Sequence, residues 1–334
     1  MITLTSHILG TGIVTPHGTS IAFSAGPPPV TEVTNPETGR KHLIATVPTA
    51  FSSHLAREPR LRRASNISML AATAALAAIA QSGITPNSRT ALVVGVSNGC
   101  AQYTRRFYEQ IVKTGANTAS PLLFPETVHN APASHLASML KLDGATYTLI
   151  GDATVGLQAL HFANQLLAMR DADNVIVVAA EELDWILAEG HQLWRLTSRT
   201  GTCRPYAGGG GTLLAEGGAA IVLSLDGNST KLTTTPGQTI PNRRHATAAL
   251  RASIEALGGP APDHVVDGAN GTWIDASFAE FSPVDRRFSP KANIGEAIGA
   301  SALQQVVLAT TLAGRTLVPA LGWNQQAAAA IVET

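Results

Sequence analysis

The chain has 334 residues, 45% of them hydrophobic and 14% charged, a composition typical of a globular protein with one large core or two fused halves. Its 23 basic residues balance 23 acidic ones, which argues against nucleic-acid binding, and we interpret the arginines at positions 57, 60, 62 and 63 as a solvated face. The longest apolar stretch, residues 69–80, is too short and too rich in alanine to span a bilayer, so we expect a cytoplasmic protein without membrane contact.

The predicted elements alternate between strands and helices along most of the chain. A first strand at residues 2–14 precedes a Pro/Gly-rich surface excursion at residues 26–39. This alternation indicates α/β layering around a buried, largely parallel sheet. Further strands are predicted at residues 90–97, 145–150, 174–180, 219–225, 231–235, 264–267 and 328–332, and helices at residues 67–81, 101–113, 131–140, 154–169, 244–257 and 294–312.

Two similar segments indicate a duplication. Residues 150–160, IGDATVGLQAL, and residues 294–303, IGEAIGASAL, share an Ile-Gly-acid-Ala opening that leads into a helix of small residues. Each segment is expected to form a turn into a long helix, late in its half of the chain. The sequence therefore predicts a duplicated fold with an N-terminal half at residues 1–225 and a C-terminal half at residues 226–334.

The turn after the predicted strand at residues 145–150 has the form of a nucleophile-bearing turn, but residue 153 is alanine. Backbone N–H groups at the start of the next helix stabilise a thiolate or an oxyanion, which is why acyl-transfer enzymes place cysteine at such a point. Ala153 offers none of that chemistry. Asp152 could serve as a carboxylate nucleophile or base, although at a helix start it more simply acts as a cap and dipole partner.

Other candidates have both a structural and a chemical interpretation. Cys100 follows the end of a predicted strand, where a nucleophile could lie, but a free cysteine is more often a small buried hydrophobic residue. His129 and His135 are the histidines nearest to the expected cavity, and a structural role is the simpler one. The glycine run at residues 208–211 lacks the Lys-Ser/Thr of a P-loop and is interpreted as a flexible loop.

The two cysteines, Cys100 and Cys203, lie far apart in the chain and lack CxxC spacing. The sequence therefore predicts neither a disulfide framework nor a zinc site. No metal ion and no cofactor are expected.

Four blocks of the chain, in order and spacing, resemble the β-ketoacyl synthases of the thiolase-fold superfamily. Residues 120–184 contain Phe-Pro, Asn with Ala-Pro-Ala, the turn with its helix, and a strand ending in Glu-Glu. Residues 204–223 resemble the family's Arg-Pro-Phe, Gly-Phe and Glu-Gly run. Residues 265–280, VVDGANGTWIDASFAE, resemble the His-Gly-Thr-Gly-Thr segment, and residues 289–303, SPKANIGEAIGASAL, the Lys-x-x-x-Gly-His segment. The resemblance implies a thiolase-like duplicated fold of two βαβαβ halves in α-β-α-β-α layers.

The resemblance also implies that the catalytic set is replaced. In the family a cysteine carries the acyl chain, and two histidines donate hydrogen bonds to the thioester carbonyl of the malonyl unit. The matching positions are Ala153, Asp267 and Glu296, while Lys291 is retained at the lysine position. A carboxylate donates no hydrogen bond unless it is protonated, and it repels the enolate formed on decarboxylation. The standard condensation is therefore not expected.

We thus expect a non-condensing subunit, similar to the chain-length factors that pair with an active β-ketoacyl synthase in type II polyketide or fatty-acid-like pathways. The strand at residues 145–150 would pair across the interface of a heterodimer or heterotetramer, and residues 100–140 would help wall the acyl tunnel. The expected partners are the synthase and an acyl carrier protein, with no nucleic acid and no membrane. Candidate tunnel or interface residues are Cys100, His129, Asn130, Asp152 and Thr154.

Two alternatives remain open from the sequence. The fold could support acyl transfer or hydrolysis, with Cys100 as the thiol and Asp152, His129, Asp267 or Glu296 as the general base. In that case Asp267 and Glu296 could form a carboxylate pair with separated pKa values. The chain could also be a homodimeric binding protein for acyl chains.

Overall fold

The computed structural model describes residues 3–20, 26–227, 230–324 and 326–334. Ile2, the predicted start of the first strand, lies outside these ranges. Within them, no helix has both the length and the apolar character needed to cross a membrane. The helices are α1 (Asn66–Ser82), α2 (Ala101–Thr114), α3 (Ala131–Leu140), α4 (Val155–Ala168), α5 (Trp185–Leu193), α6 (Ala246–Leu257), α7 (Asp275–Phe278), α8 (Lys291–Ile294) and α9 (Ser301–Ala309). The strands are β1 (Leu4–Val14), β2 (Thr31–Thr34), β3 (Lys41–Ile44), β4 (Thr90–Val96), β5 (Thr146–Ile150), β6 (Asn174–Glu181), β7 (Gly217–Ser224), β8 (Lys231–Thr234), β9 (Gln238–Thr239), β10 (His264–Val266), β11 (Arg287–Phe288), β12 (Arg315–Leu321) and β13 (Gln326–Glu333).

The large sheet contains two groups of five strands with the same arrangement. β5, β4, β6, β7 and β1 lie side by side in one group, and β11, β10, β12, β13 and β8 in the other. Numbered along its own part of the chain, each group has the order third, second, fourth, fifth, first. The two groups meet where residues 4–7 of β1 pair with β8. The predicted duplicated α/β fold is therefore confirmed. The boundary after residue 225 falls between β7 and β8, and the division into two domains stays a prediction.

The sheet is mixed, so the prediction of a largely parallel sheet is wrong. β4 runs parallel to β5 and β6, and β10 runs parallel to β11 and β12. In contrast, β7 is antiparallel to β1 and β6, and β13 is antiparallel to β8 and β12. Part of the reason is the short turn between β12 and β13, because a connection of that length joins only antiparallel neighbours.

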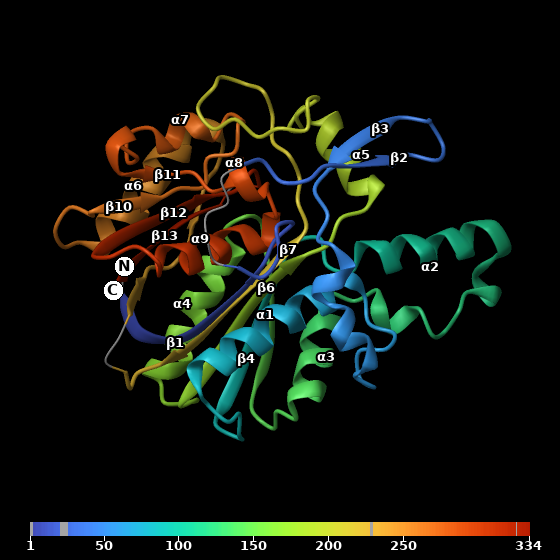
Figure 1. The fold of residues 1–334 in the computed structure, drawn as a ribbon, viewed down its shortest axis with the longest axis horizontal. Helices are drawn as coiled ribbons and strands as arrows, with labels where there is room; N and C mark the ends of the chain where they lie inside the picture. The colour runs from blue at the N-terminus through green and yellow to red at the C-terminus, as the bar shows by residue number, and fades with distance from the viewer. Residues whose placement is uncertain (1–2, 21–25, 228–229, 325) are drawn as a thin grey trace.

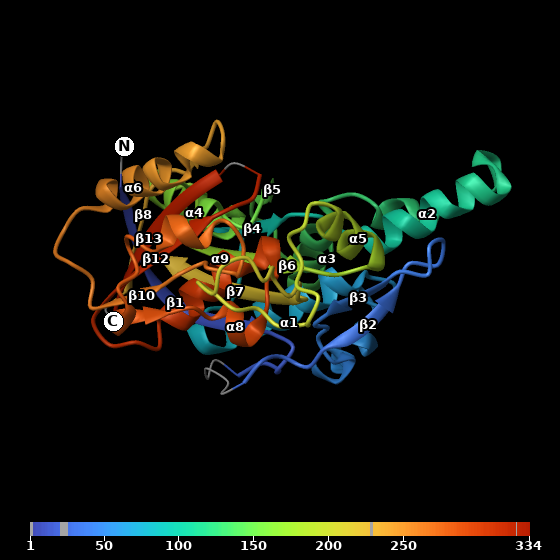
Figure 2. The same cartoon turned by 90° about the horizontal axis from the view of Figure 1, so that it is seen from above.

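Helices form the layers around and between the strands (Figure 1). α4 and α9 lie in the centre, where their apolar side chains share one core with inward-facing residues of both strand groups, such as Val177 and Val318. α1 and α3 cover the outer face of the first group, and α6 covers that of the second. This is the predicted α-β-α-β-α layering. Figure 2 shows that α2 extends away from the body of the molecule.

α1 approaches β1 closely because the facing positions of the strand are glycines. A Cβ at Gly12 would overlap the carbonyl oxygen of Ala74, and a Cβ at Gly10 would overlap that of Ala78. The helix is rich in alanine, which has the highest helix propensity, and it ends at Gly83 in the left-handed conformation. Small residues on both elements thus permit the contact that closes this side of the core.

Some elements differ from those predicted. The helix expected at residues 294–312 begins only at Ser301, because Gly295 has a φ of 77° and Glu296 pairs through its backbone with residues 213 and 215. The Pro/Gly-rich segment at residues 26–39 contains β2 and the turn of the β2–β3 hairpin, and β3 follows it. The sequence pattern does not predict α5 or β12, since Gly190 weakens the helical pattern and Pro319 argues against a strand.

Replacing Gly12 with alanine should lower the free energy of unfolding by about 1–3 kcal/mol, because the added Cβ pushes α1 away from β1. Urea unfolding followed by circular dichroism measures the change. The matched control is Gly190→Ala in α5, where a Cβ meets open space and alanine should stabilise the helix by about 0.5–1 kcal/mol. Unchanged stability of the Gly12→Ala variant would contradict this account of the contact.

Candidate functional site

Polar groups of the turn between β5 and α4 form hydrogen bonds with one another. Asp152 Oδ1 accepts hydrogen bonds from the backbone N–H and the hydroxyl of Thr154, each 3.0 Å long. Gln326 Oε1 accepts a 3.3 Å hydrogen bond from the backbone N–H of Asp152. Ala153 is only 4% exposed. Asp152 therefore closes a turn just before the helix, whose N-cap residue, Thr154, has no side-chain capping hydrogen bond, and Ala153 contributes a buried methyl group beside it.

Asp152 borders a cavity of about 180 Å³, whose other walls include Asn98, two tryptophans and His191 from α5. Burial raises the pKa of the Asp152 carboxyl group. A Cβ at residue 322 would overlap this carboxylate, so only glycine fits there. Asp152 is therefore held between its own turn and the β12–β13 connection.

The sequence does not single out His191, although it lines this cavity. Its Nδ1 donates a 2.8 Å hydrogen bond to the carbonyl oxygen of Leu187, which leaves Nε2 as the acceptor of a neutral ring. The ring centroids of His191 and Trp323 lie 5.4 Å apart. Burial lowers the pKa of His191, which favours the neutral imidazole. No motif marks this residue, because only the folding of α5 brings it to the cavity.

Glu296 and Lys291 form a buried ion pair beside the second strand group. Lys291 Nζ lies 2.6 Å from Glu296 Oε2, and the two side chains are 2% and 0% exposed. Asn270 Nδ2 donates to the same oxygen at 2.7 Å, and Ser301 Oγ donates to Oε1 at 2.5 Å. Both carboxylate oxygens thus accept hydrogen bonds from the protein. A group held in this way supplies no donor to a thioester carbonyl.

Asp267 lies apart from this ion pair. It accepts hydrogen bonds from the Tyr206 hydroxyl and from the backbone N–H of Ala269, and burial raises its pKa. The carboxylate pair considered for Asp267 and Glu296 is not formed, because each carboxylate has its own donors. Asn270 is the residue that contacts Glu296, and Asn270-Gly271-Thr272 matches the family's His-Gly-Thr if the segment is shifted by three residues. Which of Asp267 and Asn270 stands at the position of the first histidine stays a prediction, and the contact with Glu296 favours Asn270.

Cys100 is poorly suited to be a nucleophile. Its side chain is buried, its Sγ lies 3.3 Å from Ser65 Oγ, and burial raises its pKa to about 12. Almost no thiolate is therefore present at neutral pH. His129 and Asn130 are exposed, and neither lines the 180 Å³ cavity. His135 is bonded to Glu126, which raises its pKa, so it has a structural partner.

Three buried glutamates at the ends of β6 and β7 support the walls of the site. Glu181 accepts hydrogen bonds from the backbone N–H groups of Asn98, at 3.2 Å, and Gly299, at 3.0 Å. Glu182 accepts from backbone N–H groups at the starts of α1 and α2, and Glu216 binds the segment before α1. Burial raises the pKa of Glu181 to about 8 and that of Glu182 to about 7. The only sign of them in the sequence is the Glu-Glu at the end of a strand.

Comparison with known proteins places these features in a family context. Residues 30–226 match the family described as Beta-ketoacyl synthase, N-terminal domain. The curated 3-oxoacyl-[acyl-carrier-protein] synthase 2 of Vibrio cholerae is 26% identical over 113 residues, or 33% of this chain and 27% of that protein. Nodulation protein E of Rhizobium meliloti is 26% identical over 191 residues, or 55% of this chain and 47% of that protein. The chain thus spans less than half the length of the curated relatives it matches.

Solved structures match over nearly the whole chain. A β-ketoacyl synthase from Burkholderia phymatum has a TM-score of 0.85 and 17% identity, with 99% of both chains covered. The ishigamide ketosynthase/chain length factor has a TM-score of 0.78 and 20% identity, again with 99% of both chains covered. A type II PKS acyl-carrier protein in complex with its ketosynthase bound to the hexaketide has a TM-score of 0.79 and 12% identity, with 100% of both chains covered. At these identities the matches establish the fold.

The free energy of unfolding should fall as the pH rises from about 6.5 to 8. In the folded chain the pKa values of Glu181 and Glu182 are about 8 and 7, above the ordinary glutamate value of about 4.3. The unfolded chain therefore binds fewer protons at these groups in this window, and each group contributes a slope of up to about 1.4 kcal/mol per pH unit. Unfolded histidines are largely neutral there and oppose the trend little. Urea unfolding at several pH values measures the slope.

Glu181→Gln should make this slope less steep by up to about 1.4 kcal/mol per pH unit, because glutamine does not titrate and the contribution of one group is lost. Glu280→Gln is the matched control, since it removes the same charge from an exposed ion pair with Arg251. It should leave the slope unchanged. The same slope in the parent and in Glu181→Gln would contradict the proposed link.

Proposed function

The chain belongs to the β-ketoacyl synthase family, and we propose that it is a non-condensing member that pairs with an active β-ketoacyl synthase and shapes its acyl tunnel. The observation that carries the proposal is that none of the three catalytic positions offers a free reactive group. Ala153 has no nucleophilic atom, Asn270 donates to Glu296, and Glu296 is the counter-charge of Lys291. The scaffold of a condensing enzyme is thus retained without its reactive groups.

The edge of the sheet offers the surface for pairing. β5 ends the first strand group, and among the described strands only β4 pairs with it. Ile150 is 61% exposed and Tyr147 is 38% exposed on this strand. An exposed edge with apolar side chains favours the addition of a strand from another chain. We propose that the partner synthase supplies that strand.

The protruding part that follows β4 supports the proposed tunnel wall. α2 buries none of its residues completely, and apolar side chains at positions 108, 112, 122 and 124 are exposed on it and on the segment behind it. These side chains can be covered by a second subunit. The proposed substrate is an acyl chain on a carrier protein, since one solved relative is described as a ketosynthase in complex with an acyl-carrier protein.

The pairing can be tested with an active β-ketoacyl synthase that has the cysteine and both histidines in place. Ile150→Asp should weaken the complex at least about tenfold, because a charge would be buried at the edge-strand interface. Val284→Asp, at an apolar residue outside β5 that is even more exposed than Ile150, is the matched control and should leave the complex intact. Co-purification and light scattering measure assembly. A stable homodimer that excludes the synthase would contradict the proposal.

Acyl transfer by this chain can be tested by intact-protein mass spectrometry after incubation with acyl and malonyl thioesters. No adduct should form on the parent, because Ala153 is inert and Cys100 holds its proton at neutral pH. Ala153→Cys should accept an acyl group without gaining condensation, because Asn270 and Glu296 replace the histidines. An adduct on the parent that disappears in Cys100→Ala would instead favour the acyltransferase or hydrolase.

A further inference from the structure

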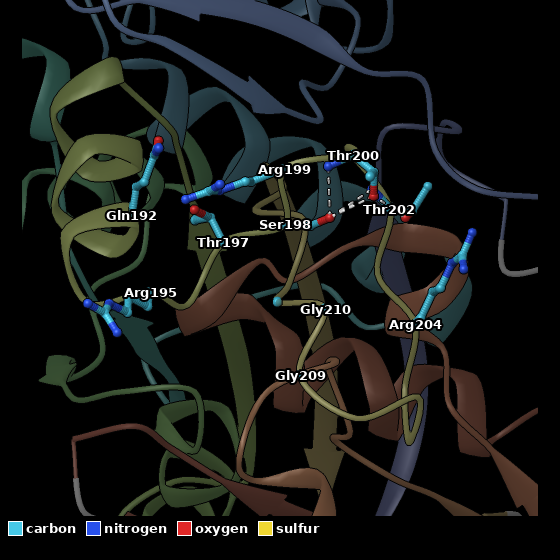
Figure 3. A pocket seen from close by; sticks show the side chains of 11 residues that line it. Gln192, Arg195, Thr197, Ser198, Arg199, Thr200, Thr202, Arg204, Gly209 and Gly210 are labelled. Carbon is cyan, nitrogen blue, oxygen red and sulfur yellow. Dashed lines mark hydrogen bonds between the residues drawn. The ribbon is translucent and has the colours of Figure 1, made fainter.

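Two pockets border α5, and the side chains of the smaller one converge on a single space. The larger pocket, of about 620 Å³, is formed by the end of α5, residues 197–204 and the glycine run. Figure 3 shows Arg195 and Arg204 at opposite edges of it, pointing away from Gly210, so these side chains share no binding point. The smaller pocket is the 180 Å³ cavity beside Asp152, and the proposed pairing does not use its aromatic side chains.

Three aromatic rings gather at this cavity. The ring centroid of His191 lies 5.4 Å from that of Trp323 and 6.0 Å from that of Trp194. The ring planes are inclined by 59° and 64°, so the rings do not stack and their faces stay available. Trp194 is 64% exposed, which places its ring at the rim and gives access from solvent. Aromatic faces, and those of tryptophan above all, attract a cation through the negative charge of the π-system.

The polar side chains of the cavity use their donors elsewhere. Asn98 Nδ2 donates a 3.1 Å hydrogen bond to Glu181, and His191 Nδ1 donates to the backbone of its own helix. Trp323 Nε1 donates a 3.1 Å hydrogen bond to the hydroxyl of Thr272. Asn98 and His191 each keep an acceptor atom for a ligand. These side chains therefore suit a positively charged ligand better than an anion or a carbonyl group.

Asp152 adds a negative charge at the wall of the cavity. It is 3% exposed, its Oδ1 is bonded to Thr154, and its Oδ2 is buried without a hydrogen-bond partner among the described residues. Burial raises the pKa of this carboxyl group, and the hydrogen bonds from Thr154 together with the nearby backbone N–H of Asn324 offset the rise only in part. The described residues that line the cavity include no lysine or arginine. A cation in the cavity would supply the missing counter-charge, because an opposite charge stabilises the ionised carboxylate.

From this arrangement we infer that the cavity binds a small quaternary ammonium ion. A quaternary ammonium group has no N–H donor, so it needs no free oxygen atom and binds through aromatic faces and a nearby negative charge. The volume of about 180 Å³ suits a trimethylammonium group with a short substituent. The inference stands independently of the proposed pairing, because it needs neither a partner subunit nor a reactive group.

Isothermal titration of the full-length chain with choline chloride, at an ionic strength held constant with sodium chloride, tests the site. Saturable binding is expected. 3,3-Dimethylbutan-1-ol has the shape of choline with a neutral carbon in place of the nitrogen, so it should bind at least about tenfold more weakly. Ethanolamine should also bind more weakly, because a primary ammonium group is strongly hydrated. No saturation with choline, or binding of either other compound as tight as that of choline, would overturn the inference.

Two variants separate the charge from the aromatic rings. Asp152→Asn keeps the size of the side chain and an oxygen for the bonds from Thr154, and it should weaken choline binding at least about tenfold without changing that of 3,3-dimethylbutan-1-ol. Trp194→Ala should weaken choline binding about fivefold, and the fold should tolerate it because this ring is mostly exposed.

Asp143→Asn is the matched control, because it removes the same charge from an exposed aspartate outside the cavity. It should change the affinity for choline less than about twofold, since solvent and salt screen a distant charge. Unchanged choline binding in both Asp152→Asn and Trp194→Ala, or an equal loss in the control, would overturn the inference.

Discussion

The close contact between α4 and α9 in the central layer fixes the turn that holds Asp152 and Ala153 relative to Glu296. Gly156 permits this contact, because a Cβ there would lie only 2.7 Å from the backbone nitrogen of Leu303. α4 starts at the turn that holds Asp152 and Ala153, and α9 starts shortly after Glu296. The distance between the two helices therefore determines the distance between the former nucleophile position and the ion pair with Lys291.

The polar groups near the starts of these two helices have hydrogen-bond partners inside the protein. In a condensing enzyme of the family, the site needs an open nucleophile and free hydrogen-bond donors. Here Asp152 accepts hydrogen bonds from Thr154, and Glu296 accepts hydrogen bonds from Lys291, Asn270 and Ser301. Buried polar groups are stable only when their hydrogen bonds are satisfied, and both oxygens of Glu296 meet this condition.

Much of the fold could be predicted from the sequence, because strong hydrophobic periodicity and glycine-marked turns are local signals. The positions of α1, α3 and β4 follow from these signals almost to the residue. The turn that contains Ala153, between a strand and a helix, is also evident from the sequence. The contacts of Asp267 and Asn270 could not be predicted in the same way. The two residues lie three positions apart in one segment, and the sequence alone does not show which of them meets Glu296. The place of His191 at its cavity depends on how segments distant in the sequence come together. Whether neighbouring strands run parallel or antiparallel also depends on how the chain connects them.

The ion pair between Lys291 and Glu296 has an evolutionary consequence. A single change of Glu296 back to histidine would leave Lys291 buried without its counter-charge, and losing one partner of a buried pair costs about 3–5 kcal/mol. That is a large share of the roughly 5–15 kcal/mol that stabilises a typical domain. A cysteine at residue 153 would meanwhile bring no benefit until the other positions had changed as well. A single substitution toward the residues of a condensing site is therefore destabilising on its own.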